Sequence, residues 1–219
     1  MSHTIPGTCV SVEYLVLGML ENNVYIISDG SSVFVVDPSC EPDRIMKALN
    51  GRVPEAIVLT HRHFDHVGAA EALRERTGAP VVASVVDAPM ICGDEPTPLS
   101  DRPFTPCPVD RVLKDGETFQ VGSMPWKVIA TPGHTPGGMC LYLDARDGSN
   151  PKGAPVLVSG DTLFAGSIGR TDFAGGSLKQ MRASLKRLAT LPNNTKVLPG
   201  HGPTTTIGAE RGPVFARFA

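Results

Sequence analysis

The sequence predicts an α+β fold in which two β-layers pack face to face and helices cover their outer sides. Both halves of the chain show the same order of elements: β-hairpins, then a buried strand that ends in a polar residue, then a helix. Neither a low-complexity segment nor a linker divides the 219 residues, and one domain of this length can bury a sizeable core. We therefore expect a single domain over residues 1–219.

In the first half, near-continuous apolar runs predict strands that are covered on both faces. Asp29-Gly30 is typical of a hairpin turn between two of them. The expected strands are residues 10–18, 23–28, 32–37, 56–60 and 80–84.

Two helices are predicted between these strands, because apolar residues recur there at helical spacing. The first ends at Gly51. Its apolar face consists of Ile45, Met46 and Leu49. The second begins near Asp65 and stops at Thr77-Gly78. Its apolar face consists of Val67, Ala70 and Leu73.

Residues 93–110 (GDEPTPLSDRPFTPCPVD) have no periodicity and are rich in proline and acidic side chains, so we expect a loop. Two roles fit a loop of this length. It is either a lid over a functional site, with Phe104 as an apolar contact, or a stiffened surface connection.

The second half of the chain repeats this pattern. A hairpin and three further strands are expected at residues 117–121, 126–130, 138–143, 156–159 and 195–198. A helix begins after Ser177, which forms a capping box with Gln180. The core stripe of this helix is Leu178, Met181, Leu185 and Leu188. Its solvated face carries Lys179, Arg182 and Lys186.

The composition is that of a soluble globular protein and argues against several classes. A formal net charge of -2 gives no strong attraction to nucleic acid or anionic membranes. No apolar run approaches the roughly 20 residues that cross a bilayer, and residues 1–7 lack the features of a signal peptide. The five cysteines are scattered without a C-x-x-C pair, which favours reduced thiols and a cytoplasmic location.

Three histidines and one aspartate fall within residues 61–66, directly after a predicted strand. Imidazole nitrogen and carboxylate oxygen are ligands of zinc-type metals. His61 and His63 lie two residues apart where the strand ends, so both can face one point. Asp65 and His66 follow in the first helical turn and face a neighbouring point. A metal site explains this cluster better than any structural role.

Three further candidates lie in glycine-flanked turns after or between predicted strands, namely His134, Asp161 and His201. Taken alone, each has an ordinary explanation, because a lone histidine is more often a core or surface residue and Asp161 is a common turn former. Together with the cluster they make seven ligands. That number is too large for one tetrahedral ion and suits two ions that share a bridging carboxylate.

The motif His61-Arg-His-Phe-Asp-His66 resembles the signature of the metallo-β-lactamase superfamily. Three later motifs follow in the order that this superfamily shows: Gly133-His134-Thr135, Gly160-Asp161-Thr162 and Gly200-His201-Gly202. The resemblance covers nearly the whole chain. It implies a four-layer αββα sandwich of two mixed β-sheets flanked by helices.

Within the superfamily, the chain resembles the glyoxalase II (hydroxyacylglutathione hydrolase) group, especially its short bacterial members. One basis is Asp161, where many β-lactamases of this fold have cysteine; another is the segment 160–173 (GDTLFAGSIGRTDF). By this resemblance, one metal is held by His61, His63 and His134. The second metal is held by Asp65, His66 and His201, and Asp161 bridges the two.

The substrate contacts depart from the eukaryotic enzyme. Glyoxalase II has a Lys-Phe-Tyr stretch after its Gly-Asp-Thr motif, where this chain has Arg170-Thr-Asp172. Arg170 can replace the lysine, whereas Asp172 cannot stack as a tyrosine does. Beyond His201 the chain offers little more than Arg211 and Arg217 in place of a basic helical extension. Arg170 and Asp172 are the expected substrate-binding residues, and an acyl-thiol small molecule is the expected partner.

The resemblance implies a hydrolase of thioesters such as S-lactoylglutathione. A hydroxide that bridges two cations attacks the carbonyl, and one cation stabilises the oxyanion. A thiol with a free pKa of about 8.5 leaves as thiolate without a general acid. Asp65, which orients the nucleophile, and Asp161 are the expected catalytic carboxylates. Zinc is the expected metal, and the same donors accept iron or manganese.

Three alternatives stay open at this point. A persulfide dioxygenase of the same fold also carries a Gly-Arg-Thr-Asp-Phe stretch, and its single iron would be held by His61, His134 and Asp161. A hydrolase of another ester or a lactone would use the same two ions. A non-catalytic metal-binding module is the third class, and the complete ligand set argues against it.

Overall fold

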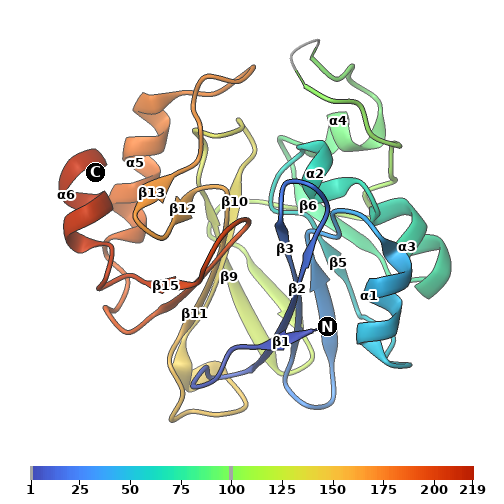
Figure 1. The fold of residues 1–219 in the computed structure, drawn as a ribbon, viewed down its shortest axis with the longest axis horizontal. Coiled ribbons are helices and arrows are strands. Elements are labelled where there is room, and N and C mark those ends of the chain that lie inside the picture. Colours follow the sequence, from blue (N-terminus) through green and yellow to red (C-terminus); the bar gives the residue numbers. More distant parts are fainter. Residues whose placement is uncertain (1, 99–100) are drawn as a thin grey trace.

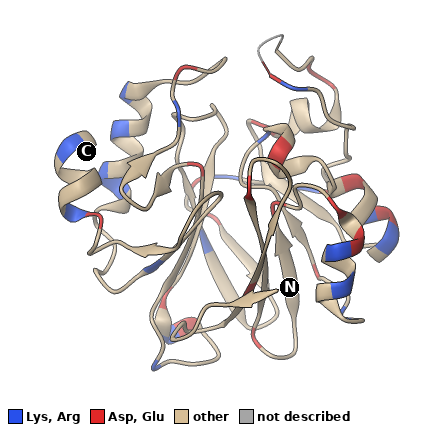
Figure 2. Ribbon diagram, in the orientation of Figure 1, with Lys and Arg blue, Asp and Glu red and all other residues tan. Residues whose placement is uncertain are grey.

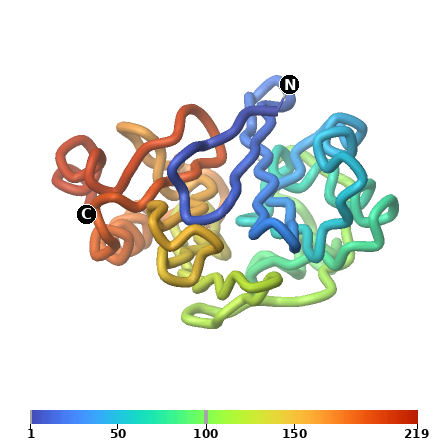
Figure 3. The backbone as a smooth tube through the Cα atoms, turned by 90° about the horizontal axis from the view of Figure 1, so that it is seen from below, coloured from blue at the N-terminus to red at the C-terminus, as the bar shows by residue number. Residues whose placement is uncertain are grey.

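The computed structural model describes residues 2–98 and 101–219. Two mixed β-sheets pack face to face, and helices cover the outer side of each sheet (Figure 1). The order of the layers is therefore helix, sheet, sheet, helix, as the αββα prediction requires. In the view from below, the blue and cyan helical region and the orange and red one lie on opposite sides (Figure 3).

The first sheet has the strand order β1-β2-β3-β4-β5-β6-β7. Neighbours from β1 to β4 pair antiparallel and those from β4 to β7 pair parallel. The strands are β1 (His3–Thr4), β2 (Ser11–Leu17), β3 (Asn22–Ser28), β4 (Val33–Val36), β5 (Ile57–Val58), β6 (Val81–Ser84) and β7 (Arg111–Leu113). All five predicted strands are present, although β5 spans two residues instead of the predicted 56–60.

The second sheet has the order β15-β14-β11-β10-β9-β8. Its strands pair antiparallel except for β11 and β14, which are parallel. The strands are β8 (Thr118–Val121), β9 (Met124–Ala130), β10 (Met139–Leu143), β11 (Val156–Gly160), β14 (Lys196–Pro199) and β15 (Thr205–Thr206). A separate small hairpin consists of β12 (Leu163–Phe164) and β13 (Ser167–Ile168).

The outer side of the first sheet carries α1 (Pro42–Leu49), α2 (Phe64–Val67), α3 (Ala70–Thr77) and α4 (Ala88–Cys92). The prediction of one helix from Asp65 to Thr77 is wrong, because the helix is interrupted between α2 and α3. A Cβ atom on Gly68 would lie 2.5 Å from the Ser39 carbonyl oxygen. The Ala69 amide donates to the carbonyl of Pro38 at 2.9 Å. This contact anchors the turn between α2 and α3 to the segment that follows β4.

The second sheet is covered by α5 (Leu178–Leu188), a π-helical turn η2 (Arg211–Phe215) and α6 (Ala216–Phe218), while the 3-10 turn η1 (Ala145–Asp147) follows β10. The Gln180 amide donates to the Ser177 hydroxyl at 3.3 Å, so the predicted cap is present. Leu178 is 42 % exposed and does not belong to the core stripe. The basic residues of α5 are exposed as predicted, and Figure 2 shows them along that helix.

Three apolar cores separate the four layers. The core between the sheets includes Phe34 and Trp126, whose rings meet edge to face at 5.4 Å. A second core lies between the first sheet and its helices, and a third lies between the second sheet and α5. The five cysteines are free, and Cys9, Cys107 and Cys140 are buried. In the described part of the chain, no helix combines the length and apolar character needed to cross a membrane.

Candidate metal centre

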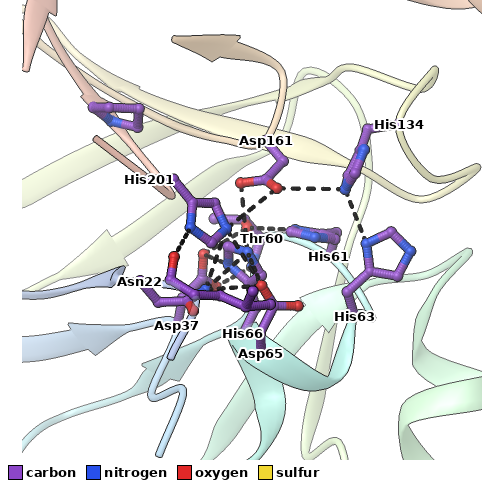
Figure 4. A network of polar contacts seen from close by, with 12 residues as sticks. Asn22, Asp37, Thr60, His61, His63, Asp65, His66, His134, Asp161 and His201 are labelled. Atoms are coloured by element: carbon purple, nitrogen blue, oxygen red, sulfur yellow. Dashed lines mark hydrogen bonds and ion pairs between the residues drawn. The ribbon is translucent and has the colours of Figure 1, made fainter. Parts of the chain in front are cut away.

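Polar side chains from both sheets meet at the edge where their strands end (Figure 4). The first sheet contributes residues that follow β5 or lie in α2: His61, His63, Asp65 and His66. The second sheet contributes residues from the loops after β9, β11 and β14: His134, Asp161 and His201. All seven residues selected from the sequence therefore lie in one cluster.

Three histidines form the first group of possible ligands: His61, His63 and His134. All three are buried, and one ligand atom from each lies within 4.8 Å of the others. Nδ1 of His63 lies 2.9 Å from Nε2 of His134. Within the described residues, Nε2 of His61 is buried without a hydrogen-bond partner, which fits a nitrogen prepared to bind a cation.

The second group consists of Asp65, His66 and His201. Oδ2 of Asp65 lies 3.3 Å from Nε2 of His201 and 3.7 Å from Nε2 of His66. The Asn22 amide donates to the same Asp65 oxygen at 3.1 Å. One oxygen and two imidazole nitrogens thus face a common point, which is a donor set that zinc, iron and manganese accept.

Asp161 lies between the two groups and contacts both. Its Oδ2 is 3.5 Å from Nε2 of His134 in the first group and 3.6 Å from Nε2 of His201 in the second. Its Oδ1 lies 3.4 Å from Nε2 of His66. These distances suit a carboxylate that bridges two ions.

Asp37 controls the orientation of two ligand histidines. Its carboxylate accepts a hydrogen bond from Nδ1 of His66 at 2.9 Å and one from the Thr60 hydroxyl at 2.7 Å. Because the single Thr60 proton goes to Asp37, the hydroxyl oxygen accepts from Nδ1 of His61 at 3.0 Å. In the neutral form of each ring this leaves Nε2 without hydrogen and directed toward the centre.

His134 and His201 are oriented by hydrogen bonds to backbone carbonyls. Nδ1 of His134 lies 2.7 Å from the Arg170 carbonyl, and Nδ1 of His201 lies 2.8 Å from the Leu20 carbonyl. A carbonyl only accepts, so Nδ1 carries the proton in both rings and Nε2 faces the centre. These supporting contacts orient metal ligands in the way that outer hydrogen bonds usually do.

The sequence analysis missed Asp37, Thr60 and Asn22. A signal for Asp37 was present, because this ionisable residue directly follows the apolar run Val33–Val36 and precedes a proline. Nothing in the sequence shows that Asp37 lies beside the histidines. That proximity depends on the parallel pairing of β4 with β5.

The pKa values differ between the two groups. Burial and the neighbouring imidazoles lower the pKa of His61 strongly and that of His63 to about 3, so both rings are neutral at pH 7. Burial opposes protonation of His66 as well, yet Asp161 and Asp37 raise its pKa. Burial likewise opposes ionisation of Asp65, but the hydrogen bond from His201 and the charge of His66 lower its pKa. A cation that binds the second group therefore replaces a proton.

A cavity of about 550 Å³ opens directly onto this cluster. His63, Asp65, His134, Asp161 and His201 lie on its polar side. The apolar lining consists of Leu20, Phe64, Phe164, Ile168 and Phe173. The cavity therefore presents an apolar surface next to a potential metal site, which is the usual composition of a small-molecule site.

The two predicted substrate-binding residues bind each other, and one of them lines the cavity. Arg170 lines the cavity, and its guanidinium donates to both carboxylate oxygens of Asp172 at 2.9 Å. Its Cζ atom also lies 4.2 Å from the centre of the Phe173 ring. Asp172 is not among the cavity-lining residues. Substrate binding by Arg170 and Asp172 stays a prediction.

The loop 93–110 reaches the cavity, but not through Phe104. Phe104, the apolar contact expected if the loop were a lid, packs against the core between the first sheet and its helices and does not line the cavity. Asp101 and Arg102 line the cavity instead, and Arg102 stacks over the Phe64 ring at 5.2 Å. Residues 99 and 100 of this loop lie outside the described part of the chain.

Comparison with known proteins agrees with this geometry. The family model of the metallo-beta-lactamase superfamily matches residues 17–201. A probable metallo-hydrolase of Bacillus subtilis, YqgX, is 33% identical over 209 residues, covering 89% of this chain and 92% of that protein.

Two solved structures are similarly close. TTHA1623 in a di-iron-bound form is 38% identical with a TM-score of 0.76, and the match covers 91% of this chain and 97% of the other. BLEG-1, a B3 metallo-beta-lactamase, is 35% identical with a TM-score of 0.78, covering 91% and 95% of the two chains.

Proposed function

The chain belongs to the metallo-β-lactamase superfamily of metallo-hydrolases, and on this premise we propose that it hydrolyses thioesters of the S-lactoylglutathione type with two divalent metal ions. One observation carries the proposal: two complete ligand groups lie side by side, and Asp161 contacts both. Such an arrangement is typical of hydrolytic sites with two metals.

In this proposal each ligand group holds one ion. One ion is held by His61, His63 and His134. The other is held by Asp65, His66 and His201, and Asp161 serves both. When bound, the ions lower the pKa of water and polarise a carbonyl oxygen.

The remaining tasks fall to the residues of the chain. Asp65 lies beside His66 and His201, where its carboxylate can accept a hydrogen bond from the attacking water and orient it. The apolar side chains of the cavity exclude bulk water from the acyl group. A thiolate leaving group needs no general acid, which fits a cluster whose five histidines all belong to ligand groups.

The proposal names zinc as the expected metal and iron as its main competitor. Five imidazoles and two carboxylates suit either ion. The di-iron-bound form of TTHA1623 supports iron as a serious candidate for a chain of this fold. Elemental analysis of the purified protein decides between them, with an expected content of two equivalents per chain.

The test of the activity is a substrate panel on metal-loaded protein. We expect hydrolysis of S-lactoylglutathione and of simple acyl thioesters. The loss of the thioester absorbance measures the rate. A β-lactam belongs in the panel because BLEG-1 is a B3 metallo-beta-lactamase. Turnover of the β-lactam or of a lactone without any turnover of thioesters would replace the proposed substrate class.

The second candidate is a persulfide dioxygenase with a single iron held by His61, His134 and Asp161. The stretch Gly169-Arg-Thr-Asp-Phe173 and the contact between His134 and Asp161 at 3.5 Å favour it. It predicts oxygen uptake with glutathione persulfide and one iron per chain. Thioester hydrolysis with two metals and no oxygen uptake excludes it.

A further inference from the structure

Arg62 lies between two of the first-group histidines, yet its side chain is buried rather than directed to solvent. Only 8 % of Arg62 is exposed. Nη2 donates to the Ala174 carbonyl at 2.9 Å, and Nη1 lies 3.9 Å from Oδ1 of Asp87. Arg62 therefore connects the cluster loop with the segment that follows Phe173 and with a buried carboxylate.

Asp87 is fully buried in the loop between β6 and α4. Its Oδ2 accepts from the backbone amide of Arg62 at 3.1 Å and from the Thr135 hydroxyl at 2.9 Å. Its Oδ1 accepts from the backbone amide of Gly137 at 2.9 Å. One carboxylate of the first sheet thus binds the loop that carries His63 and the loop that carries His134.

The packing around this carboxylate is tight enough to transmit a displacement. A Cβ atom on Gly137 would lie 2.4 Å from both Cγ and Oδ1 of Asp87, so the loop after His134 rests directly on the carboxylate. The two loops supply the ring nitrogens of His63 and His134 that lie 2.9 Å apart. A change of Asp87 therefore alters the relative position of two first-group ligands.

A stabilising role alone does not explain the pair. Burial raises the pKa of Asp87, while the charge of Arg62 opposes that shift. Buried ion pairs contribute little net stability because the loss of hydration offsets their attraction. A buried ion pair can also hold neighbouring segments in one relative position. Asp87 accepts hydrogen bonds from both ligand loops and can hold them in this way.

We propose that Asp87 is a positioning residue for the first metal ion and that Arg62 extends this control to the cavity wall. Asp87 holds the loops of His63 and His134 at the spacing that one ion requires. Arg62 holds the Ala174 carbonyl, next to Phe173 of the cavity. This inference rests on the proposed function, because it assumes that His61, His63 and His134 bind one ion.

The test is a titration of metal-free protein with Co²⁺, followed by its visible absorption. The band that disappears in His63→Ala identifies the first site. In Asp87→Asn we expect Co²⁺ to bind that site about 10- to 100-fold more weakly, as for other residues that orient ligands. The affinity of the second site for Co²⁺ should change less than about threefold, because that site does not contact Asp87.

Asp110→Asn is the matched control. Asp110 lies before β7 and pairs with Arg74, as Asp87 pairs with Arg62, and it also accepts from the backbone amide of Val81. Within the described residues, the hydrogen bonds to its carboxylate come from Arg74 and Val81 and from no ligand loop. The inference fails if both variants bind Co²⁺ at the first site as the wild type does, or if Asp87→Asn weakens both sites equally.

Two further variants keep the inference testable if Asp87→Asn does not fold. Thr135→Val removes one donor to Asp87 without leaving a buried charge unpaired, and it should weaken the first site several-fold; unchanged binding overturns the proposal. Arg62→Met removes the donor to the Ala174 carbonyl, so it should raise KM for the thioester by a larger factor than it lowers kcat; an unchanged KM would overturn the role given to Arg62. If the wild type itself binds no metal, the proposed function fails instead.

Discussion

Asp161 is the residue on which both ligand groups depend, because its carboxylate contacts histidines from both. Two oxygens serve three imidazoles at 3.4–3.6 Å. Its pKa is lowered despite burial by the charges of His66 and His134, so the carboxylate is ionised at neutral pH. Loss of this one charge affects both sites at once.

Asp161→Ala should therefore reduce turnover by more than roughly 100-fold and leave fewer than two metal equivalents per chain. Elemental analysis and thioester assays on the same sample measure the two effects together. Asp144→Ala, a surface aspartate that pairs with Arg146, is the control and should keep both properties. Full activity of the Asp161 variant would remove this residue from the site.

At this scale the sequence was most informative about ligands and least informative about their supports. His61, His63 and His66 could be selected because ligand types cluster within a few residues. Asp37 could not, because its role depends on a neighbouring strand that places its carboxylate beside His66. Such contacts arise from strand order, which spacing along the chain does not encode.

Among the secondary-structure elements, the interruption between α2 and α3 matters most for the site. The sequence predicted one continuous helix because Val67, Ala70 and Leu73 keep helical spacing. The backbone of Gly68 lies so close to the Ser39 carbonyl oxygen that the helix is interrupted there, although the apolar residues keep helical spacing. The short strands β1, β7, β12, β13 and β15 were missed as well, since two or three residues give no measurable periodicity.

Gly68→Ala should destabilise the protein by about 1–3 kcal/mol, because the new Cβ meets the backbone oxygens of Ser39 and Phe64 at 2.5 and 2.9 Å. Backbone cannot move aside as a side chain can. The variant should also bind the second metal ion more weakly, since α2 carries Asp65 and His66. Urea unfolding measures the stability difference.

Gly212→Ala is the control for this change, because a Cβ atom there meets nothing within 4 Å. It should leave urea unfolding and metal content close to the wild type. Equal unfolding midpoints for the two variants would show that the approach of Gly68 to Ser39 is not restrictive.

Asp29 joins two turns at the opposite end of the sandwich. Its carboxylate accepts from Ser31 and Ser32 in its own turn and from the Ser123 amide and hydroxyl in the β8–β9 turn. Burial opposes ionisation, but the hydrogen bonds from Ser123 and Ser32 outweigh it and lower the pKa of Asp29. The ionised carboxylate therefore stabilises the folded state.

Asp29→Ala should cost about 1 kcal/mol at pH 7, a value reduced for the partial exposure of the site. A carboxyl with a lowered folded-state pKa contributes fully above its unfolded pKa of about 3.9 and loses that contribution as the pH falls. The gap between wild type and variant should therefore shrink as the pH falls below about 4. Thermal unfolding across pH 2–7 checks this, and a constant gap would contradict it.

At the scale of the whole molecule, the metal centre joins the two sheets. Four ligands come from the first half of the chain and three from the second. The αββα order could be predicted because both halves carry the same sequence of elements. The closing C-terminal segment could not, since Gly212-Pro213 within η2 reads as a helix breaker.

Removal of metal should lower the melting temperature. An ion bound at a concentration 100 times its Kd stabilises the folded state by about 2.7 kcal/mol. For a chain of this size that corresponds to a fall of roughly 5–10 °C when a chelator removes one ion. Calorimetry with and without chelator measures the shift, and restored Zn²⁺ should reverse it. An unchanged melting temperature would contradict metal binding at the junction of the sheets.

The division of the ligands between the halves also affects synthesis. A ribosome releases the chain from its N-terminus, so His61, His63 and His66 leave the exit tunnel long before His201. The first ligand group, with His61, His63 and His134, is therefore synthesised before the second group, which needs His201. If the two groups bind ions as proposed, we expect the ion of the first group to be captured first, so that the order of the loops along the chain sets the order in which the centre is assembled.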